Sequence, residues 1–310
     1  MIVSAVFTMA LQDAVVKFVS ADFPLWQIYT LRSFIAIPML VAVVFLFGGA
    51  TTLRPRALSW AMLRGGLLVA MYIAFYASLP FLDLSLVAAA YYTGPLFITL
   101  FAALLLGEHV GRREILAILL GFAGVLVILR PGTEAFSPAM LVPIAAAVFY
   151  ALANILTRGK CLEESPLSLS LALNFCFILC GGGLTALLAV LQLSPKTVAV
   201  NPFLLGAWVP VAWSEWAVLG GLAVANVIIH LALAKAYQSA PPQTIAAFDY
   251  SYLVFAAIWG FLLFREIPDL ATLLGMALIA GAGLLLVLLR DGSRSPARSG
   301  GLDRRTSEDA

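Results

Sequence analysis

The sequence predicts an all-α membrane protein with ten transmembrane helices, arranged as two inverted repeats of five helices each. Three observations predict this fold class. Hydrophobic residues make up 63% of the 310 residues and charged residues only 11%, whereas a soluble domain carries about 25% charged residues. Apolar runs long enough to cross a bilayer recur along the whole chain. Segments of the first half are also echoed in the second half.

The apolar runs define the expected helices. A transmembrane helix needs about 20 mainly apolar residues, within a range of roughly 17 to 25. The runs do not alternate and are too long for barrel strands, so helices are favoured. We expect helices at residues 2–19, 25–47, 58–79, 84–105, 112–129, 138–157, 167–192, 215–236, 243–264 and 269–289. Because Asp13 and Lys17 interrupt the first run, we expect a retained helix and not a cleaved signal peptide.

The connections and the tail differ in composition from the helices. The longest connection spans residues 194–214, and its Trp208 and Trp213 suit a membrane interface. The tail from residue 291 is rich in Ser, Arg, Gly and Asp. Such a segment cannot bury a core, so we expect it to be disordered.

Lysine and arginine residues predict the orientation, because cytoplasmic loops carry an excess of them. With the N-terminus inside, the outer loops hold only Arg130, Lys196 and Arg265. The inner loops and the tail hold Arg54, Arg56, Arg112, Arg113, Arg158, Lys160, Arg290, Arg294, Arg298, Arg304 and Arg305. We therefore expect a multi-pass protein of the inner (plasma) membrane with both termini in the cytoplasm.

Two pairs of segments carry the internal repeat. Residues 6–32 align with residues 148–174 at one constant offset, which matches Arg32 to Asn174. Residues 107–130 and 265–290 each have an acidic residue at a helix junction, a glycine-rich apolar helix and a final arginine. We interpret the acidic residues, Glu108 and Glu266, as structural caps that accept N–H bonds from the start of the next helix. Each half holds five predicted helices, and because five is odd the second copy would enter the membrane inverted.

Inverted repeats are typical of secondary transporters, in which equivalent halves rock to expose a central site to either side. The predicted organisation is therefore a first repeat at residues 1–130, a second at residues 136–290, and a cytoplasmic tail at residues 291–310.

This pattern resembles the EamA type of the drug/metabolite transporter superfamily, over about residues 1–290. The matching residues are Gly107, Glu108, Gly121, Gly124, Pro131, Glu266, Gly275, Gly281 and Gly283. The second junction departs mildly from the family pattern, because Arg265 stands before Glu266 where the family often has glycine.

The resemblance implies a central cavity lined by helices 1–4 and 6–9, with helices 5 and 10 at the periphery. Family members carry amino acids, S-adenosylmethionine, riboflavin, sugars and other metabolites. Asp13–Lys17 followed by Pro24, Gln27 and Arg32 resembles a subgroup of riboflavin and S-adenosylmethionine carriers. The leading substrate is therefore riboflavin, and the alternative is an amino acid or its derivative, imported or exported.

Three charged residues fall inside the first two predicted helices. Asp13 and Lys17 are four residues apart and share a helix face. A charge at the bilayer centre costs about 2.5–3.5 kcal/mol on insertion scales. The two residues are either an ion pair that lines a cavity or charges near the membrane edge, with Lys17 reaching the interface. Arg32 either attracts an anionic group or Asp13, or ties the fold through backbone carbonyls or Asp22.

Two further ionisable residues are candidates in the second half. Asp249 is flanked by aromatic residues, including Tyr250, which could stack on a flat ring. The alternative for Asp249 is a carboxylate at the cytoplasmic interface. His230 falls within a predicted helix, where it is either a packing residue or part of a proton or substrate site.

Tyrosine and asparagine residues complete the candidate set. Tyr76, Tyr91 and Tyr92 either line the cavity or pack with bonded hydroxyls. Pro95 shortly after Tyr92 frees a backbone carbonyl, and broken helices commonly line cavities. Asn154 either binds substrate or links helices. The substrate-binding or coupling candidates are Asp13, Lys17, Arg32, Tyr76, Tyr91, Tyr92, Asn154, His230, Asp249 and Tyr250.

Several function classes lack support in the sequence. There is no phosphate-binding loop, nucleophile elbow or paired-histidine metal motif, so we expect no catalytic residue, metal or cofactor. A net charge of +2 does not indicate nucleic-acid binding. The expected partners are a small-molecule substrate and the lipid bilayer, and the chain is either a monomer or a homodimer. A secondary transporter is favoured over an intramembrane transferase or a non-transporting receptor.

Overall fold

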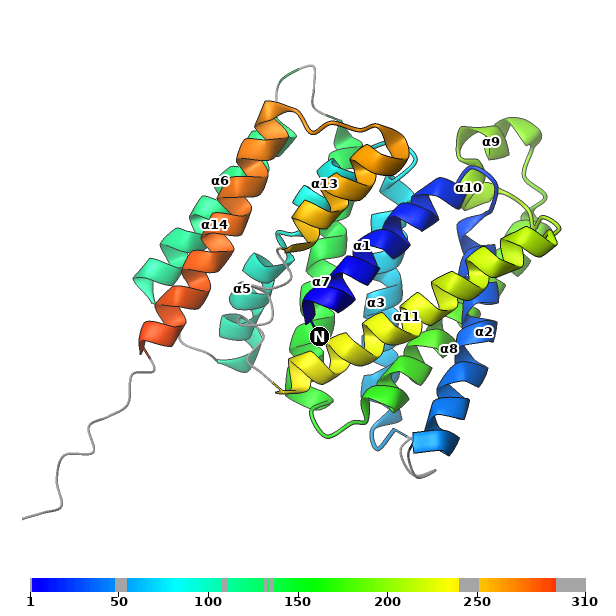
Figure 1. Ribbon diagram of the computed structural model, residues 1–310, viewed down its shortest axis with the longest axis horizontal. Helices are drawn as coiled ribbons and strands as arrows, with labels where there is room; N and C mark the ends of the chain where they lie inside the picture. Colours follow the sequence, from blue (N-terminus) through cyan, green and yellow to red (C-terminus); the bar gives the residue numbers. More distant parts are fainter. Residues whose placement is uncertain are drawn as a thin grey trace, which may run out of the picture.

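The computed structural model describes residues 2–47, 55–107, 111–130, 133, 137–239 and 251–293, and this part of the chain is helical without strands. Figure 1 shows the helices as a single bundle. The first half contains α1 (Ile2–Val19), α2 (Leu25–Phe47), α3 (Leu58–Ser78), α4 (Leu84–Tyr91), α5 (Gly94–Leu106) and α6 (Arg112–Leu129). The rest contains η2 (Pro138–Leu141), α7 (Val142–Lys160), α8 (Pro166–Leu191), α9 (Pro195–Val200), α10 (Pro202–Leu205), α11 (Trp213–Ser239), α13 (Ser251–Phe264) and α14 (Leu270–Ser293).

The run predicted at residues 84–105 forms two helices, α4 and α5, instead of one. Pro95 lies at the start of α5 and has no N–H to continue the ladder of α4. The Thr93 hydroxyl donates to the carbonyl oxygen of Ala90 at 2.8 Å, which satisfies one acceptor at the break. The irregularity indicated by Pro95 is therefore present, between Tyr91 and Gly94.

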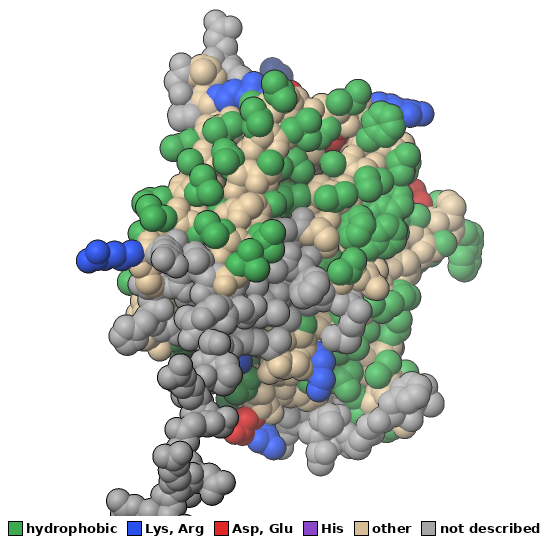
Figure 2. Space-filling view, turned by 60° about the vertical axis from the view of Figure 1, so that its left-hand side comes forward, with side chains coloured by type: hydrophobic (Ala, Val, Ile, Leu, Met, Phe, Trp, Pro, Cys, Tyr) green, Lys and Arg blue, Asp and Glu red, His purple; other side chains and the backbone are tan. Residues whose placement is uncertain are grey.

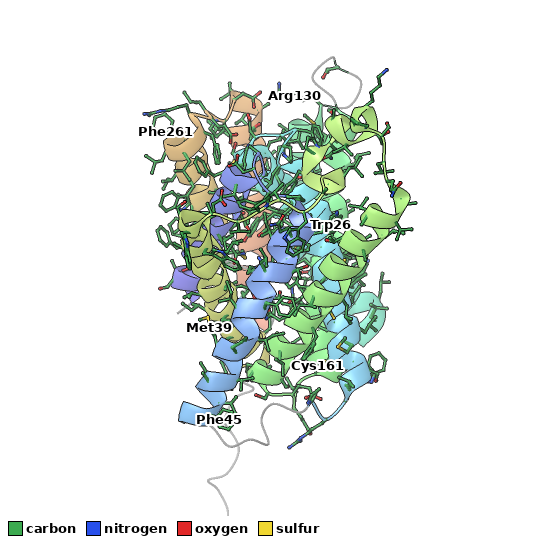
Figure 3. The ribbon with its side chains drawn as sticks, turned by 90° about the vertical axis from the view of Figure 1, so that its right-hand side faces the viewer. Trp26, Met39, Phe45, Arg130, Cys161 and Phe261 are labelled. Carbon is green, nitrogen blue, oxygen red and sulfur yellow. The ribbon has the colours of Figure 1, made fainter. Side chains whose placement is uncertain are left out.

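The long connection at residues 194–214 contains two short helices that the sequence analysis did not predict. Each begins at a capped residue: the Ser194 hydroxyl accepts from the Thr197 N–H, and the Asn201 side chain accepts from the Leu204 N–H. The connection is also tied to α2, because the Gln27 side chain both accepts from and donates to the backbone of Val209. The Trp26 indole, which Figure 3 labels, donates to the Leu204 carbonyl at 2.7 Å.

Helix length and apolarity suit a membrane. Six spans in the described residues are long and apolar enough to cross one, and three further apolar helices are shorter. The six are Leu25–Phe45, Leu58–Ser78, Leu84–Leu106, Pro138–Lys160, Pro166–Leu191 and Trp213–Ser239. Figure 2 shows hydrophobic side chains spread over most of the described surface of one face, with few charged ones among them. An apolar outer surface of this extent is what lipid tails would cover.

The helices pack in a fixed set of pairs. Figure 1 shows α6 and α14 lying side by side at one edge of the bundle. Their contact is close because Gly275 leaves room: a Cβ there would lie 2.8 Å from the carbonyl oxygen of Gly124. Small residues allow such close approach between membrane helices. The other main pairs are α3 with α7, α2 with α8, α3 with α8, α5 with α7, α1 with α13, α1 with α11, and α11 with α2.

Candidate functional site

Asp13 lies at the meeting point of three helices. Its carboxylate accepts a hydrogen bond from the Tyr76 hydroxyl of α3 at 2.8 Å and one from the Tyr252 hydroxyl of α13 at 2.6 Å. The neighbouring Gln12 amide donates to the same Tyr76 hydroxyl at 3.3 Å. Asp13 is only 4% exposed. A buried carboxylate needs such donors, and two hydroxyls satisfy part of its demand.

Aromatic rings surround this carboxylate. The Tyr252 ring stacks on Tyr92 of the α4–α5 break, with centroids 4.8 Å apart. Tyr91, next to it, packs against Tyr150 of α7 at 5.4 Å. The Tyr150 hydroxyl in turn lies 3.1 Å from that of Tyr237 on α11. The predicted tyrosines of the first half thus lie beside tyrosines of the second half.

His230 is bonded to an aromatic residue of the same cluster. Its Nε2 lies 3.1 Å from the Tyr72 hydroxyl, and both side chains are buried. Tyr72 lies one turn before Tyr76 on α3, and their ring centroids are 5.4 Å apart. His230 is therefore joined to Asp13 through two neighbouring tyrosines.

Arg32 is fully buried and surrounded by rings instead of carboxylates. Its Cζ lies 4.6 Å from the ring centroid of Phe177, 5.6 Å from that of Tyr29 and 6.0 Å from that of Tyr72. Within the described part of the chain, none of its three guanidinium nitrogens has a hydrogen-bond partner. The structure therefore shows neither the ion pair with Asp13 nor the bonds to carbonyls or Asp22 that the sequence suggested.

Lys17 does not pair with Asp13, which was one of the two alternatives for these residues. Its ammonium forms an ion pair with Glu266 and donates to the Leu82 carbonyl at 2.9 Å. The carboxylate of Asp13 is instead bonded to tyrosines. Both side chains of the ion pair are 12% exposed.

Glu266 caps a helix, although not the helix that the sequence indicated. Its carboxylate accepts from the Leu84 N–H, the first residue of α4, at 2.8 Å. The next helix, α14, is capped instead by Asp269, whose carboxylate accepts from the Thr272 N–H at 2.8 Å. Glu266 therefore links α1, α4 and the segment before α14.

The remaining candidates fall in two groups. Asn154 is buried and donates to the Tyr150 carbonyl of its own helix at 3.0 Å. Asp249 and Tyr250 lie outside the described residues, as does Glu108. Among the described residues, no three His, Cys, Asp or Glu side chains come together as a metal site would require.

The sequence analysis missed several residues of this cluster, among them Gln12, Tyr29 and Phe177. Helical spacing could have indicated Tyr29, because it lies three residues before Arg32. Phe177 contacts Arg32 across the packed pair of α2 and α8, which helical spacing alone does not reveal.

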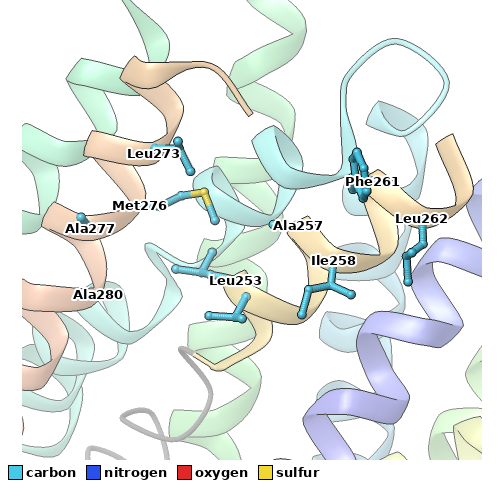
Figure 4. A pocket seen from close by; sticks show the side chains of 10 residues that line it. Leu253, Ala257, Ile258, Phe261, Leu262, Leu273, Met276, Ala277 and Ala280 are labelled. Carbon is cyan, nitrogen blue, oxygen red and sulfur yellow. The ribbon is translucent and has the colours of Figure 1, made fainter. Parts of the chain in front are cut away.

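A separate groove of about 550 Å³ lies between α13 and α14. Figure 4 shows its lining of apolar side chains, among them Leu253, Phe261 and Met276. No charged or hydrogen-bonding side chain lines it. A groove of this kind suits an acyl chain or a hydrophobic surface, so we assign the polar cluster around Asp13 as the candidate site.

Residues 1–130 match the model of the EamA-like transporter family. The pseudopaline exporter CntI of Pseudomonas aeruginosa is 29% identical, covering 94% of this chain and 95% of its own length. A riboflavin transporter of Vibrio cholerae is 26% identical over 87% of this chain and 86% of its own. An S-adenosylmethionine uptake transporter of Rickettsia felis is 25% identical over 89% and 87%.

A solved crystal structure matches with a TM-score of 0.64 at 20% sequence identity, covering 95% of this chain and 99% of its own. A likeness at this identity extends the shared fold over nearly the whole chain. The relatives are named as transporters or exporters, which agrees with the expectation of a non-enzyme.

Proposed function

We propose, from the premise that residues 1–130 belong to the EamA-like transporter family, that the chain is a secondary transporter of the inner membrane working by alternating access. It is a membrane protein that carries a small metabolite and not an enzyme. The proposal adds ten crossings in two inverted halves, residues 1–130 and 136–290, a cytoplasmic tail at residues 291–310, and cytoplasmic termini. The candidate site around Asp13 would lie between the halves.

The pattern of helix contacts supports the repeat. Let α1, α2, α3, α4–α5 and α6 correspond in order to α7, α8, α11, α13 and α14. Exchanging the two halves then turns most main contacts into others that are present: α3 with α7 becomes α11 with α1, and α5 with α7 becomes α13 with α1. In the same way α3 with α8 becomes α11 with α2, while the pairs α2 with α8 and α6 with α14 map onto themselves. A contact map with this property is expected of two equivalent halves related by a pseudo-two-fold axis. The contact of α8 with α11 is an exception, because α2 and α3 are not packed closely in the same way.

The contact between α6 and α14 also agrees with an exchange of the two halves. Aligning Glu108 with Glu266 matches Ala117 to Gly275 and Gly124 to Ala282. Gly124 and Gly275 are in contact, and Ala117 and Ala282 are both fully buried in one cluster. The Gly124–Gly275 contact and the cluster that holds Ala117 and Ala282 are therefore at positions equivalent by sequence.

The site draws on both halves. Asp13, Tyr76 and Arg32 come from the first half, and Tyr252 and His230 come from the second. A carrier with alternating access needs its binding groups at such a junction, because rocking of the halves then changes which side reaches them. This distribution between halves is the observation that carries the proposal.

One end of the bundle is closed by the Lys17–Glu266 ion pair. The position equivalent to Lys17 is Gly159, where a Cβ would lie 3.2 Å from the Leu106 side chain. In the same way the Lys17 ammonium lies 5.0 Å from the Phe264 ring centroid, and Phe264 is the equivalent of Leu106. The equivalent pairs, Lys17 with Phe264 and Gly159 with Leu106, thus both lie close together, but only the first carries a charge. With the proposed orientation, the ion pair closes the outer end.

Riboflavin remains the leading substrate in this proposal, and an amino acid or a derivative such as S-adenosylmethionine is the alternative. The tyrosine rings around Asp13 suit a flat or amphiphilic molecule, because aromatic faces stack on planar rings. The names of the relatives include both kinds of cargo. Whether the chain imports or exports its substrate is open in this proposal.

The central experiment measures flux through the purified protein. Liposomes containing it would be tested for uptake of labelled riboflavin and S-adenosylmethionine, with Asp13→Asn as the matched inactive variant. The proposal predicts saturable uptake that exceeds that of protein-free liposomes and falls in the variant. Conversion of a probe into a new compound would instead indicate a transferase.

A second experiment tests the topology. Tags at the two termini should be accessible only from the cytoplasmic side, as an even total number of crossings requires. Termini on opposite sides of the membrane would overturn the two five-helix halves.

A further inference from the structure

Arg32 is a buried cation that forms neither an ion pair nor a hydrogen bond among the described residues. The side chain is 0% exposed, and Nε and both terminal nitrogens lack a hydrogen bond within the described residues. A guanidinium has five N–H donors and remains charged in proteins. An unpaired charge at this depth is expensive, and such residues in membrane helices mark substrate or ion pathways.

The surrounding rings stabilise the cation without using its donors. Phe177, Tyr29 and Tyr72 lie within cation–π distance of its Cζ, and this attraction is stronger in a water-excluded place. A ring face interacts with the charge but does not accept the N–H bonds as a carboxylate oxygen would. The arrangement therefore holds the guanidinium in position with its hydrogen-bonding capacity unused.

Other unpartnered polar atoms lie on α2 itself and on two helices packed against it, α8 and α11. The Tyr29 hydroxyl and the Asn174 side-chain oxygen, three residues before Phe177, lack hydrogen bonds in the part of the chain that the structure describes. Neither end of the Asn226 side chain has a partner there, and Asn226 lies one turn before His230. Buried polar atoms are normally satisfied, so unpartnered atoms on three mutually packed helices, one of which carries Arg32, indicate a place that a polar ligand completes.

We infer that Arg32 receives a carboxylate group of the transported molecule. This inference rests on the proposed transport function and narrows its substrate class to metabolites that carry a carboxylate. It therefore favours the amino-acid alternative over riboflavin, which has no carboxylate. The guanidinium fork matches the two oxygens of a carboxylate and binds them through parallel hydrogen bonds. The Tyr29 hydroxyl, whose ring contacts the guanidinium, is a further donor for the same group.

A carboxylate fits this place better than a phosphate group. Arg32 supplies one positive charge, and within the site it interacts electrostatically with the carboxylate of Asp13. A second negative charge on the ligand would have no counterpart among these residues. Asp13 is not the receiver of an anion, and its oxygens are already bonded to Tyr76 and Tyr252.

The test compares cargo molecules that differ in one carboxylate. Liposomes containing the wild-type protein would be given labelled S-adenosylmethionine, decarboxylated S-adenosylmethionine and riboflavin, and free amino acids with their carboxamides as competitors. The inference predicts that each transported or competing compound loses at least tenfold in potency when its carboxylate is removed. Arg32→Gln should abolish this preference, and Arg32→Lys should restore part of it.

Thermal unfolding of the same variants separates a binding role from a structural one. Replacing an unpaired buried charge by an apolar side chain is often neutral or stabilising. We therefore expect Arg32→Met to have a Tm equal to or above that of the wild type while its flux is lost. A structural role predicts a large fall in Tm together with the loss of flux. Gly281→Ala, on the peripheral helix α14, is the control variant with unchanged flux.

The outcomes distinguish this inference from the proposed function. If the wild type carries riboflavin or decarboxylated S-adenosylmethionine as well as any carboxylate, and Arg32→Gln retains that flux, the chain is a transporter and the carboxylate inference is wrong. A large fall in the Tm of Arg32→Met also overturns the inference. If intact liposomes with the wild type move none of the probes, the proposed function fails and this inference fails with it.

Discussion

Lys17 of α1 forms an ion pair with Glu266, which lies 249 positions later in the chain, between α13 and α14. The pair joins the two proposed halves at one end of the bundle. Replacing Lys17 by Met removes a hydrogen bond between charged groups, a loss of about 1.5–3 kcal/mol. We expect this end to open more often, by roughly tenfold or more.

Maleimide labelling of a Ser78→Cys reporter measures this opening. Ser78 is buried at the end of α3, and its carbonyl accepts from the N–H of Leu82, whose own carbonyl accepts from Lys17. The native cysteines Cys161, Cys176 and Cys180 would be replaced first. Lys17→Met should label faster than the parent, and Lys17→Arg should label at the parent rate because it keeps the charge. Equal rates in all three proteins would contradict a closing role for the pair.

The two hydroxyl groups that donate to Asp13 predict how far transport falls when each one is removed. Tyr76→Phe and Tyr252→Phe each remove one hydrogen bond to the carboxylate, and each loss corresponds to about 1.5–3 kcal/mol. If the bonds hold Asp13 in its working geometry, each variant should lower flux by roughly tenfold to a hundredfold. Asp13→Asn should lower it at least as far. Flux in liposomes is the measurement, and full activity of both phenylalanine variants would show that the hydroxyls are dispensable.

The close crossing of α6 and α14 predicts contrasting effects of two alanine substitutions on the same helix. A Cβ at Gly275 would lie 2.8 Å from a backbone oxygen of Gly124 and 2.2 Å from Ile128, whereas a Cβ at Gly281 meets nothing within 4 Å. We expect Gly275→Ala to destabilise the protein by about 1–3 kcal/mol, as overpacking does. Gly281→Ala should be neutral or slightly stabilising, because alanine favours a helix. Thermal unfolding in detergent compares the two variants. Equal Tm values would contradict the close contact of α6 with α14 at Gly275.

Asp269 predicts how the free energy of unfolding depends on pH in the acid range. Its side chain accepts from Arg130 and caps α14 through Thr272, and these bonds lower the pKa of the carboxyl from 3.8 to about 2. A pKa that is lower in the folded state contributes stability above the unfolded value, and this contribution is lost as pH falls from about 4 to about 2. Asp269→Asn should remove that part of the pH dependence. The free energies of unfolding of the wild type and Asp269→Asn, measured at pH 5, 4 and 3, check this prediction. The same dependence on pH in both proteins would refute it.

The positions of the helices were predictable because they follow from the lengths of apolar runs. α1, α2 and α6 begin and end at the residues that the sequence indicated, and the break before α5 follows from Pro95. The count of ten crossings and the inverted repeat stay predictions, since in the described residues six spans are long and apolar enough to cross a membrane and three apolar helices are shorter.

The partners of the charged residues were not predictable in the same way. Helical spacing relates Asp13 only to neighbours such as Lys17, whereas its actual donors lie on α3 and α13. Glu266 was expected to cap the helix that follows it, but it bonds to Leu84 and Lys17, which distant packing brings to it. The roles of the candidate residues in binding or coupling remain predictions.

The matched small residues of α6 and α14 have a consequence for the ancestry of this architecture. If the halves are equivalent, the surface that α6 offers to α14 is the same kind of surface that α14 offers to α6. A polypeptide of only five helices would then already be complementary to a second copy inserted upside down. Fusion of two such genes would join a pre-existing antiparallel dimer into one chain, and later substitutions, such as lysine at one end and glycine at the other, would make its two faces unequal.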